Sequence, residues 1–282
     1  MWGQEKKALN GEYLKTAAGT LAAHAEFSGE VRELHTRVAW HEGVLYYELR
    51  PGRVLRCGAD GWGFAQRPPV LFRRYPNPKH LPDPDPGDSL DVLDTLVNLK
   101  TDRDRRLFEA CLTTAALPHV LRSILGVMGA MGSGKTTIGR MVKQTWDPTA
   151  PETVRYDARD ILQKALRAYI LMFENLNTLS ETAADTCCRL VTGEADSKRK
   201  LDTEDEDVIV EVKRAVILNG INVPTYRSDV LDRSLVVELE RIPDAERRTE
   251  EELWERFEAE RPRLLGTLFG ILSEAIALKP FL

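Results

Sequence analysis

The sequence lacks the features that would place it in a membrane or in a secreted, disulfide-bonded class. None of its apolar runs approaches the roughly 20 residues that a membrane-spanning helix needs. Residues 1–7 have no apolar core of the kind that signal peptides carry. The four cysteines and five histidines show no metal-ligand spacing. We therefore expect a cytoplasmic protein with no membrane partner.

An excess of basic charge is also missing. The chain has 39 Lys and Arg against 44 Asp and Glu, a net charge of −5, so no global positive field draws nucleic acid to it. Any contact with DNA would have to be local. The content of 43% hydrophobic and 29% charged residues is typical of a globular protein, and 282 residues suffice for one large or two modest domains.

The composition changes along the chain and predicts four parts. Residues 1–75 hold a helical pattern at 4–25 and then short apolar runs between Gly, Asp and Pro turns, which indicate a small β-rich domain. Its aromatic residues could stack on single-stranded nucleic acid, although aromatics favour the core of strands in any case. Residues 76–88 form a proline-rich linker. Residues 89–243 would form the core of the protein, which begins with a helical lead-in at 89–117. Residues 244–282 would form a helical lid.

The most specific motif is a glycine-rich loop that follows the apolar run 123–128 and precedes a helical pattern. Strand, loop and helix in this order are the context of a phosphate-binding loop, in which backbone N–H groups and a helix N-terminus point at one phosphate chain. Lys135 would reach the β- and γ-phosphates, and Thr136 would ligate Mg²⁺. A chance glycine-rich turn is the alternative. The residues expected to bind the nucleotide are Gly129, Gly132, Ser133, Gly134, Lys135, Thr136 and Thr137.

Two later apolar runs end in polar residues that would complete such a site. The run 168–173 ends in Glu174 and Asn175, and an acid at a strand tip typically holds Mg²⁺ or polarises the attacking water. Glu174 could serve as metal ligand, as catalytic base, or as both. The run 215–218 ends in Asn219, which would position the water or sense the γ-phosphate.

Basic residues between and after these runs suggest contacts with DNA and with a neighbouring subunit. Residues 192–208 have the pattern of a hairpin, with Lys198, Arg199 and Lys200 at its tip, where they would touch DNA phosphates in a pore or form a solvated turn. Arg233 is the first candidate, and Arg227 the second, for an arginine finger, a side chain that reaches into the nucleotide site of a neighbouring subunit. Either arginine could instead pair locally with Asp229 or Asp232.

The C-terminal part is helical with a predicted break. Residues 250–257 have helical spacing, Pro262 ends that helix, and residues 263–278 form a second, apolar helix.

Taken together, residues 129–136, 173–175, 192–208, 218–220 and 232–233 resemble the superfamily 3-like AAA+ ATPases of phage, plasmid and viral primase-helicases. The stretch 229–239 also resembles bacterial and prophage proteins described as ATP-binding protein or putative DNA primase. The resemblance covers roughly residues 90–243. It implies an α/β fold with a parallel-sheet ATPase core, ATP and Mg²⁺ as cofactors, and assembly into a homo-oligomeric ring, a hexamer. It further implies translocation on single-stranded or forked DNA beside a primase or another replication protein.

Two other functions remain open at this point. The residues 132–140 also resemble shikimate-type kinases, which phosphorylate small molecules. A nucleotide-binding switch that regulates a partner without acting as a motor is the third reading. A motor would oligomerise with ATP and be stimulated by DNA, a kinase would respond to a small metabolite, and a switch would hydrolyse slowly.

Overall fold

The computed structural model describes residues 10–74, 79–120, 123–149, 151–154, 157, 160–174, 179–193, 195–199, 207–220 and 228–278. The chain divides into two compact units between Leu34 and His35. The first unit contains α2 (Gly11–Ser28), which begins where the Asn10 side chain accepts the Glu12 N–H at 3.2 Å. We expected a helix at 4–25. The helix overlaps that range, and residues 4–9 lie outside the described part of the chain.

The second unit begins with a small antiparallel sheet. Its strands are β2 (Val38–His41), β3 (Val44–Arg50), β4 (Arg53–Gly58) and β5 (Gly61–Ala65), in that order. The very short β1 (Leu34–His35) and β6 (Leu71–Phe72) pair with each other. Tyr47 is fully buried, and Trp62 lies 6.2 Å from Phe269, ring centre to ring centre. These two aromatics therefore serve as core.

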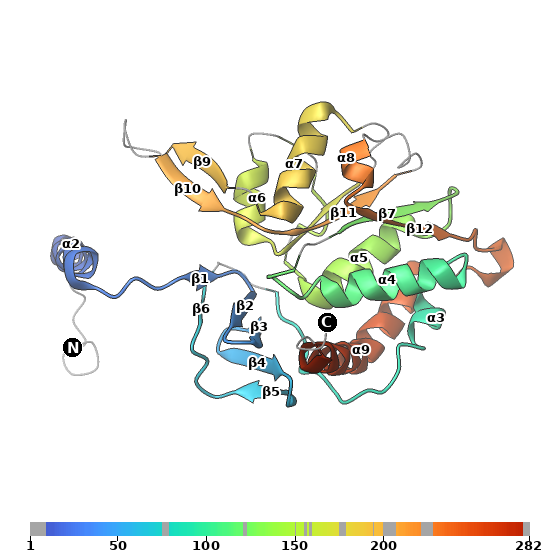
Figure 1. The fold of residues 1–282 in the computed structure, drawn as a ribbon, viewed down its shortest axis with the longest axis horizontal. Coiled ribbons are helices and arrows are strands. Elements are labelled where there is room, and N and C mark those ends of the chain that lie inside the picture. Colours follow the sequence, from blue (N-terminus) through green and yellow to red (C-terminus); the bar gives the residue numbers. More distant parts are fainter. Residues whose placement is uncertain are drawn as a thin grey trace. The chain divides into compact units, whose positions relative to one another are not determined.

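A parallel sheet forms the centre of the second unit (Figure 1). Its strand order is β12-β7-β11-β8, and every neighbouring pair is parallel. The strands are β7 (Ile124–Gly129), β8 (Ile170–Phe173), β11 (Ala215–Asn219) and β12 (Ser234–Leu239). The three apolar runs singled out above are thus adjacent strands, and their carboxyl ends meet at one edge.

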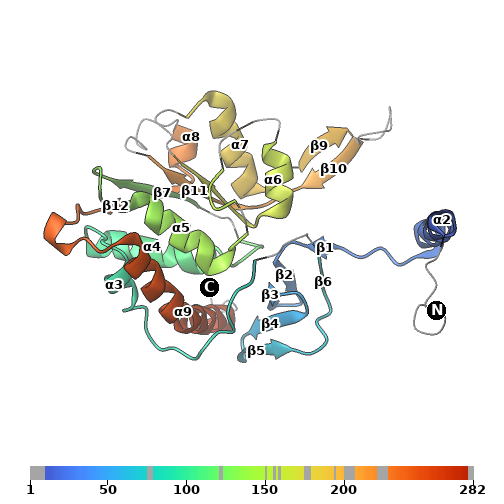
Figure 2. The ribbon, with the colours of Figure 1, turned by 180° about the vertical axis from the view of Figure 1, so that it is seen from behind.

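Helices cover both faces of this sheet, as Figures 1 and 2 show. Alternate strand residues enter two separate cores: Leu125 and Ile217 pack with α4 (Asp102–Thr114) and α5 (Lys135–Trp146), whereas Leu171 and Leu218 pack on the other side. That other side is covered by α6 (Ile161–Arg167), α7 (Glu181–Thr192) and α8 (Ser228–Leu231). Strands buried on both faces explain why these runs are continuously apolar instead of alternating.

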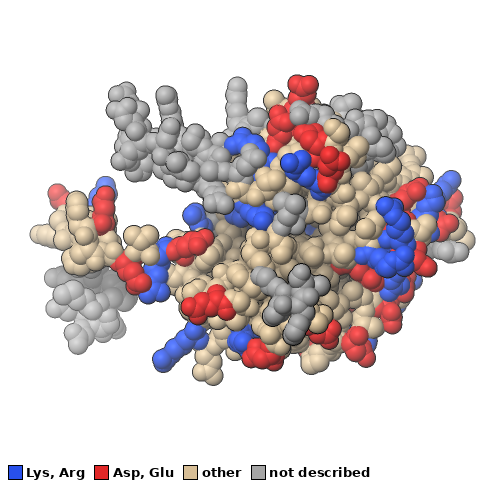
Figure 3. All heavy atoms as spheres, viewed as in Figure 1, with Lys and Arg blue, Asp and Glu red and all other residues tan. Residues whose placement is uncertain are grey.

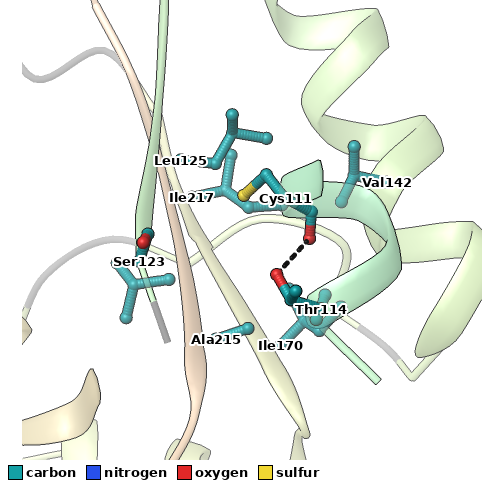
Figure 4. A pocket seen from close by; sticks show the side chains of 10 residues that line it. Cys111, Thr114, Ser123, Leu125, Val142, Ile170, Ala215 and Ile217 are labelled. Carbon is teal, nitrogen blue, oxygen red and sulfur yellow. Dashed lines mark hydrogen bonds between the residues drawn. The ribbon is translucent and has the colours of Figure 1, made fainter. Parts of the chain in front are cut away.

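The core beneath α4 is closely packed. A void of about 10 Å³ lies between α4, α5 and the sheet, and Figure 4 shows side chains that line it. The Thr114 hydroxyl there donates to the Cys111 carbonyl at 3.5 Å and to the Ala110 carbonyl at 2.7 Å. Burial in this environment raises the pKa of the Cys111 thiol to about 12. The void holds at most about one water molecule and is not a ligand site.

The expected break at Pro262 is wrong, because residues Glu250–Leu278 form one continuous helix, α9. Phe257 on one side of Pro262 and Leu264, Leu265, Leu268 and Phe269 on the other enter the same core. A proline inside a helix costs about 3 kcal/mol. Burying several large apolar side chains at about 1.5–3 kcal/mol each outweighs that cost.

The proline-rich segment does not separate two compact units, although we expected a domain boundary there. Its backbone packs directly on α9: the Asp85 N–H donates to the Pro262 carbonyl at 2.9 Å. A Cβ on Gly266 would lie only 1.7 Å from the Asp85 carbonyl oxygen. The small sheet also shares its core with α9 through Tyr47 and Phe269, whose ring centres are 5.7 Å apart. These contacts tie residues 35–74 and α9 into the second unit.

The remaining elements are short. The lead-in contains only one turn of helix, α3 (Leu93–Leu96), before α4. The hairpin consists of β9 (Ala195–Arg199) and β10 (Asp207–Glu211), which are antiparallel. Its first strand begins later than expected because α7 runs to Thr192 and ends at Gly193, which adopts a left-handed conformation with φ 86°. A 3₁₀ turn, η2 (Asp244–Glu246), precedes α9. Within the residues that the structure describes, no helix is long and apolar enough to cross a bilayer.

Candidate nucleotide-binding site

The glycine-rich loop lies between the end of β7 and the start of α5, as predicted. Gly132 and Gly134 have φ values of 82° and 81°, a backbone conformation that residues with a Cβ rarely adopt. Gly134 is the residue directly before α5, so the loop feeds straight into a helix N-terminus. A cradle of this form presents backbone N–H groups and the positive end of the helix dipole to an anion.

Lys135 and Ser133 lie inside this loop. The Lys135 ammonium donates to the carbonyls of Gly129 at 2.7 Å and Ala130 at 2.8 Å, which hold it over the loop. Partial burial lowers the pKa of Lys135. Ser133 is fully buried, and its hydroxyl has no hydrogen-bond partner among the described residues. A buried hydroxyl without a partner is costly, so it marks a place where an additional polar group would be favourable.

The ends of β11 and β8 supply the other polar groups of the site. The Asn219 side-chain N–H donates to the Thr136 hydroxyl at 2.8 Å, and Asn219 is only 3% exposed. Glu174 directly follows β8, beside β11, and one of its carboxylate oxygens is buried without a hydrogen-bond partner in the described part of the chain. Asn175 lies outside the described residues. The structure thus brings Thr136 and Asn219 into contact and places Glu174 at the same edge.

These groups fit a Mg²⁺–nucleoside triphosphate. No cluster of three His, Cys, Asp or Glu that could hold a metal by itself is present in the described ranges. Mg²⁺ does not require one, because it is usually held by one or two protein oxygens together with substrate phosphates and water. The Thr136 hydroxyl and the Glu174 carboxylate, one oxygen of which has no partner among the described residues, are suitable oxygens. The glycine cradle and the Lys135 ammonium suit the phosphates.

A cleft beside the loop was not predicted from the sequence. Its volume is about 630 Å³, and it is walled by residues 94–98 and 240–253 with Gly132, Gly134, Thr137 and Ile138 between them. The two walls are joined by Arg248, which donates to the Thr95 carbonyl at 2.6 Å. A cleft of this size beside a phosphate cradle is large enough for a nucleoside.

Arg247 is the second feature that sequence reasoning missed. A Cβ placed on Gly132 would lie 2.6 Å from one of its guanidinium nitrogens, so the cation lies directly against the loop. The Asp244 carboxylate, at 3.1 Å, holds it there. No spacing pattern relates residue 247 to the loop; the only local signal is that Arg247 and Arg248 follow Pro243 in a stretch without apolar periodicity.

Arg233, which we predicted to reach a neighbouring subunit, directly precedes β12. It therefore lies at the amino ends of the strands, whereas the glycine-rich loop lies at their carboxyl ends. Parallel pairing sets Ser234 beside Ile124 and Leu239 beside Gly129, so Arg233 is roughly 20 Å along the strands from the loop. Its guanidinium donates to the Asp229 carbonyl at 2.9 Å. Arg233 therefore cannot reach the nucleotide site of its own chain. Arg227 lies outside the described residues.

Two of the residues that we expected to contact DNA, Lys198 and Arg199, lie within strand β9 of the hairpin. Lys198 pairs with Val208 and Arg199 with Asp207, at the outer end of β9 and not at a turn. Lys200 lies outside the described residues.

A buried ionic network holds the far end of α5. The Asp147 carboxylate accepts the N–H groups of Tyr169 at 2.6 Å and Ile170 at 3.0 Å, and it pairs with Arg37 at 3.2 Å and Lys143 at 3.5 Å. Burial alone would raise the pKa of Asp147, but the charges of Lys143 and Arg37 and these hydrogen bonds hold it well below its usual value. The network fixes α5 relative to the start of β8, and thereby the two elements that carry Lys135 and Glu174.

A parallel sheet with helices on both faces, and a glycine-rich loop between its strand β7 and a helix, define a P-loop type of α/β fold. A family model described as "Actinomycete integrative conjugative element replication protein" matches residues 90–279, more than half of the chain. The chain belongs to this family of mobile-element replication proteins. Comparison with curated proteins finds no match.

Solved structures of the NrS-1 C-terminal region have a similar fold. The A form of the apo structure has a TM-score of 0.54 and 14% identity over 90% of this chain and 60% of that one. A second A-form structure, of residues 305–718, has a TM-score of 0.50 and 15% identity over 91% and 60%. A mutant of Thermotoga maritima RuvB matches 64% of this chain and 68% of its own at 14% identity, with a TM-score of 0.37. The chain thus spans about 60% of the NrS-1 region that it matches.

Proposed function

We propose that the protein is a Mg²⁺-dependent ATPase that works on DNA during replication of an integrative conjugative element. The observation that carries the proposal is the hydrogen bond from Asn219 to Thr136, at the edge where Glu174 has a buried oxygen without a partner among the described residues. It joins the tip of β11 to the first turn of α5, at the edge where the phosphate cradle lies. The family match supports a role in replication over a small-molecule kinase or an unrelated switch.

In this proposal each residue has a distinct task. The cradle at Gly132–Gly134 and the Lys135 ammonium bind the phosphates, and Arg247 adds positive charge from the same chain. Thr136 and Glu174 hold Mg²⁺, which when bound neutralises charge that develops on the phosphates. Asn219 orients the attacking water, and the open side of the Glu174 carboxylate accepts a hydrogen bond from it. The cleft at residues 94–98 and 240–253 receives the nucleoside.

We further propose that the active form is a ring of identical subunits. Arg233 is too distant to serve its own site, so in a ring it would serve the site of the next subunit and stabilise the transferred phosphoryl group. The β9–β10 hairpin, with Lys198, Arg199 and Lys200, would contact single-stranded or forked DNA. A hexamer is the expected ring size, and a primase or another replication protein is the expected partner.

The nucleotide-binding proposal is tested by ATP hydrolysis and ATP binding in the full chain and in Lys135→Ala. The variant should lose about 10²-fold or more of the hydrolysis rate, because a preorganised cation at the phosphates is removed. Lys164→Ala, a change of the same residue type on α6, is the control and should retain the rate. A normal rate of ATP hydrolysis in Lys135→Ala would contradict the proposed nucleotide site.

A further inference from the structure

The helix α2 (Gly11–Ser28) is the feature from which we draw a further inference. It has 18 residues, none of them buried, and it belongs to the first compact unit, which ends at Leu34. An isolated helix of this length is only marginally stable in water, because nucleation is costly and protein helices are stabilised mainly by the packing of an apolar face. A partner that covers one face of α2 would therefore stabilise it.

One face of α2 carries a stripe of apolar residues. Side chains three and four positions apart lie on the same side of a helix, which groups the two leucines of α2 with three alanines. The stripe consists of Leu14, Ala17, Ala18, Leu21 and Ala25. Leu14 is 52% exposed and Leu21 is 71% exposed. Figure 3 shows that most of the visible surface of α2 is neither acidic nor basic. Such a stripe is complementary to the apolar face of another helix.

The order of large and small residues makes this stripe complementary to itself. In an antiparallel pair of α2 helices centred between residues 19 and 20, Leu14 of one copy faces Ala25 of the other. Leu21 faces Ala18, and both contacts occur twice by symmetry. Large residues opposite small ones fill the space between two helices evenly. A parallel pair would instead set leucine against leucine and alanine against alanine.

The charges beside the stripe favour the same arrangement. Lys15 and Glu26 lie on one flank of it, next to Ala22, and neither makes an ion pair in the described part of the chain. In an antiparallel pair this flank runs beside the same flank of the other copy, so Lys15 of each copy lies near Glu26 of the other. In a parallel pair it would run beside the opposite flank, where α2 has no Lys, Arg, Asp or Glu. Opposite charges therefore meet only in the antiparallel pair.

We infer that α2 is a dimerisation helix, which binds α2 of a second copy of this chain in antiparallel orientation. The interface is isologous, because both copies use the same stripe. The leucines of both copies are removed from water, and a Lys15–Glu26 ion pair lies on each half of the interface. Dimerisation requires neither ATP nor the residues of the nucleotide-binding site.

The first test is sedimentation equilibrium of the full chain without nucleotide, over a range of protein concentrations. The unchanged chain should dimerise. Leu14→Ala combined with Leu21→Ala should weaken dimerisation by about 100-fold or more, because the interface loses its large apolar side chains. Alanine is the best helix former, so the helix itself is not disfavoured. The control is Phe27→Ala, which removes a side chain that is 87% exposed but outside the stripe, and it should dimerise like the unchanged chain.

The second test exchanges the charges. Lys15→Glu and Glu26→Lys each set like charges against each other at both ion pairs, so each variant alone should dimerise about tenfold more weakly. A mixture of the two variants should form heterodimers of normal strength, because every contact between unlike chains again joins opposite charges. Native mass spectrometry distinguishes the heterodimer from both homodimers. Lys135→Ala should dimerise normally, which separates this result from the ATPase test.

Three outcomes would overturn the inference. One is a chain that stays monomeric at every concentration, which would leave α2 exposed or covered by its own chain. Another is normal dimerisation of the chain with Leu14→Ala and Leu21→Ala, which would place the interface elsewhere. The third is a mixture of the two charge variants that dimerises no better than either alone, which would exclude the antiparallel arrangement.

Discussion

At the scale of single residues, the site depends on polar side chains that are buried and only partly satisfied. Asn219 donates to Thr136, while Ser133 and Glu174 each have a buried oxygen that lacks a partner among the described residues. Unpaired buried oxygens destabilise the free protein, and a bound ion or phosphate chain can recover that free energy. The arrangement is therefore one in which ligand binding stabilises the fold.

Asn219→Ala should uncouple binding from hydrolysis. The substitution removes the N–H that Thr136 accepts and the proposed contact with water, but leaves the phosphate cradle intact. We expect the hydrolysis rate to fall by about 10²-fold, as for loss of one preorganised donor, with ATP affinity changed less than tenfold. Steady-state hydrolysis and titration with a fluorescent ATP analogue measure the two quantities. A variant that hydrolyses at the normal rate would exclude Asn219 from the chemistry.

Asp147→Asn should destabilise the protein in a pH-dependent way. At pH 7 it leaves Lys143 and Arg37 without their carboxylate, which costs about 3–5 kcal/mol of unfolding free energy. The pKa of Asp147 is lower in the folded protein, so its contribution is present above about pH 4, the unfolded pKa, and is lost as the pH falls below it. Urea unfolding at pH 7 and pH 3.5 should therefore show a smaller difference at pH 3.5. An equal difference at both values would contradict this account.

At the scale of elements, α9 illustrates where local rules fail. Pro262 predicts a helix break, and the proline-rich residues 76–88 predict a boundary, because both rules consider only neighbours in sequence. The structure differs in both places because of contacts between residues far apart in sequence. Apolar side chains on both sides of Pro262 enter one core, and Asp85 lies against Gly266. By contrast, β7, β8 and β11 could be predicted, because each is a short apolar run, and a glycine-rich loop follows β7 while polar residues stand at the ends of β8 and β11.

Two glycines of α9 provide a matched test of that contact. Gly266→Ala would place a Cβ 1.7 Å from the Asp85 carbonyl oxygen, so we expect a loss of about 2 kcal/mol or more of unfolding free energy. Gly270→Ala meets no atom within 4 Å and should gain about 0.5–1 kcal/mol from its helix propensity. Thermal or urea unfolding compares the two. Equal effects would contradict the packing of residues 85–87 on the helix.

At the scale of the whole molecule, the phosphate loop could be predicted from the sequence, whereas the cleft beside it could not. The cleft forms because residues 94–98 and 240–253 lie close together in space, and no local sequence pattern predicts that contact. Arg247 escaped prediction for the same reason. The position of Arg233 is likewise a property of the parallel register, which sets it at the edge away from the loop.

Assemblies that mix two variants test whether Arg233 acts on the nucleotide site of a neighbouring subunit. Arg233→Ala should bind ATP but not hydrolyse it, and Lys135→Ala should do neither. If Arg233 serves a neighbour, mixing the two inactive variants should restore part of the hydrolysis, because some interfaces combine an intact Lys135 site with an intact Arg233. Hydrolysis is followed as the mixing ratio changes. No recovery at any ratio would count against action between subunits.

We propose above all that ATP hydrolysis by this chain is coupled to DNA. The most direct measurement is ATP hydrolysis by the purified full chain with and without single-stranded DNA, together with its mass in solution when ATP is present. We expect an oligomer whose hydrolysis rises when DNA is added and is abolished in Lys135→Ala. A monomer that hydrolyses ATP slowly and does not respond to DNA would contradict it.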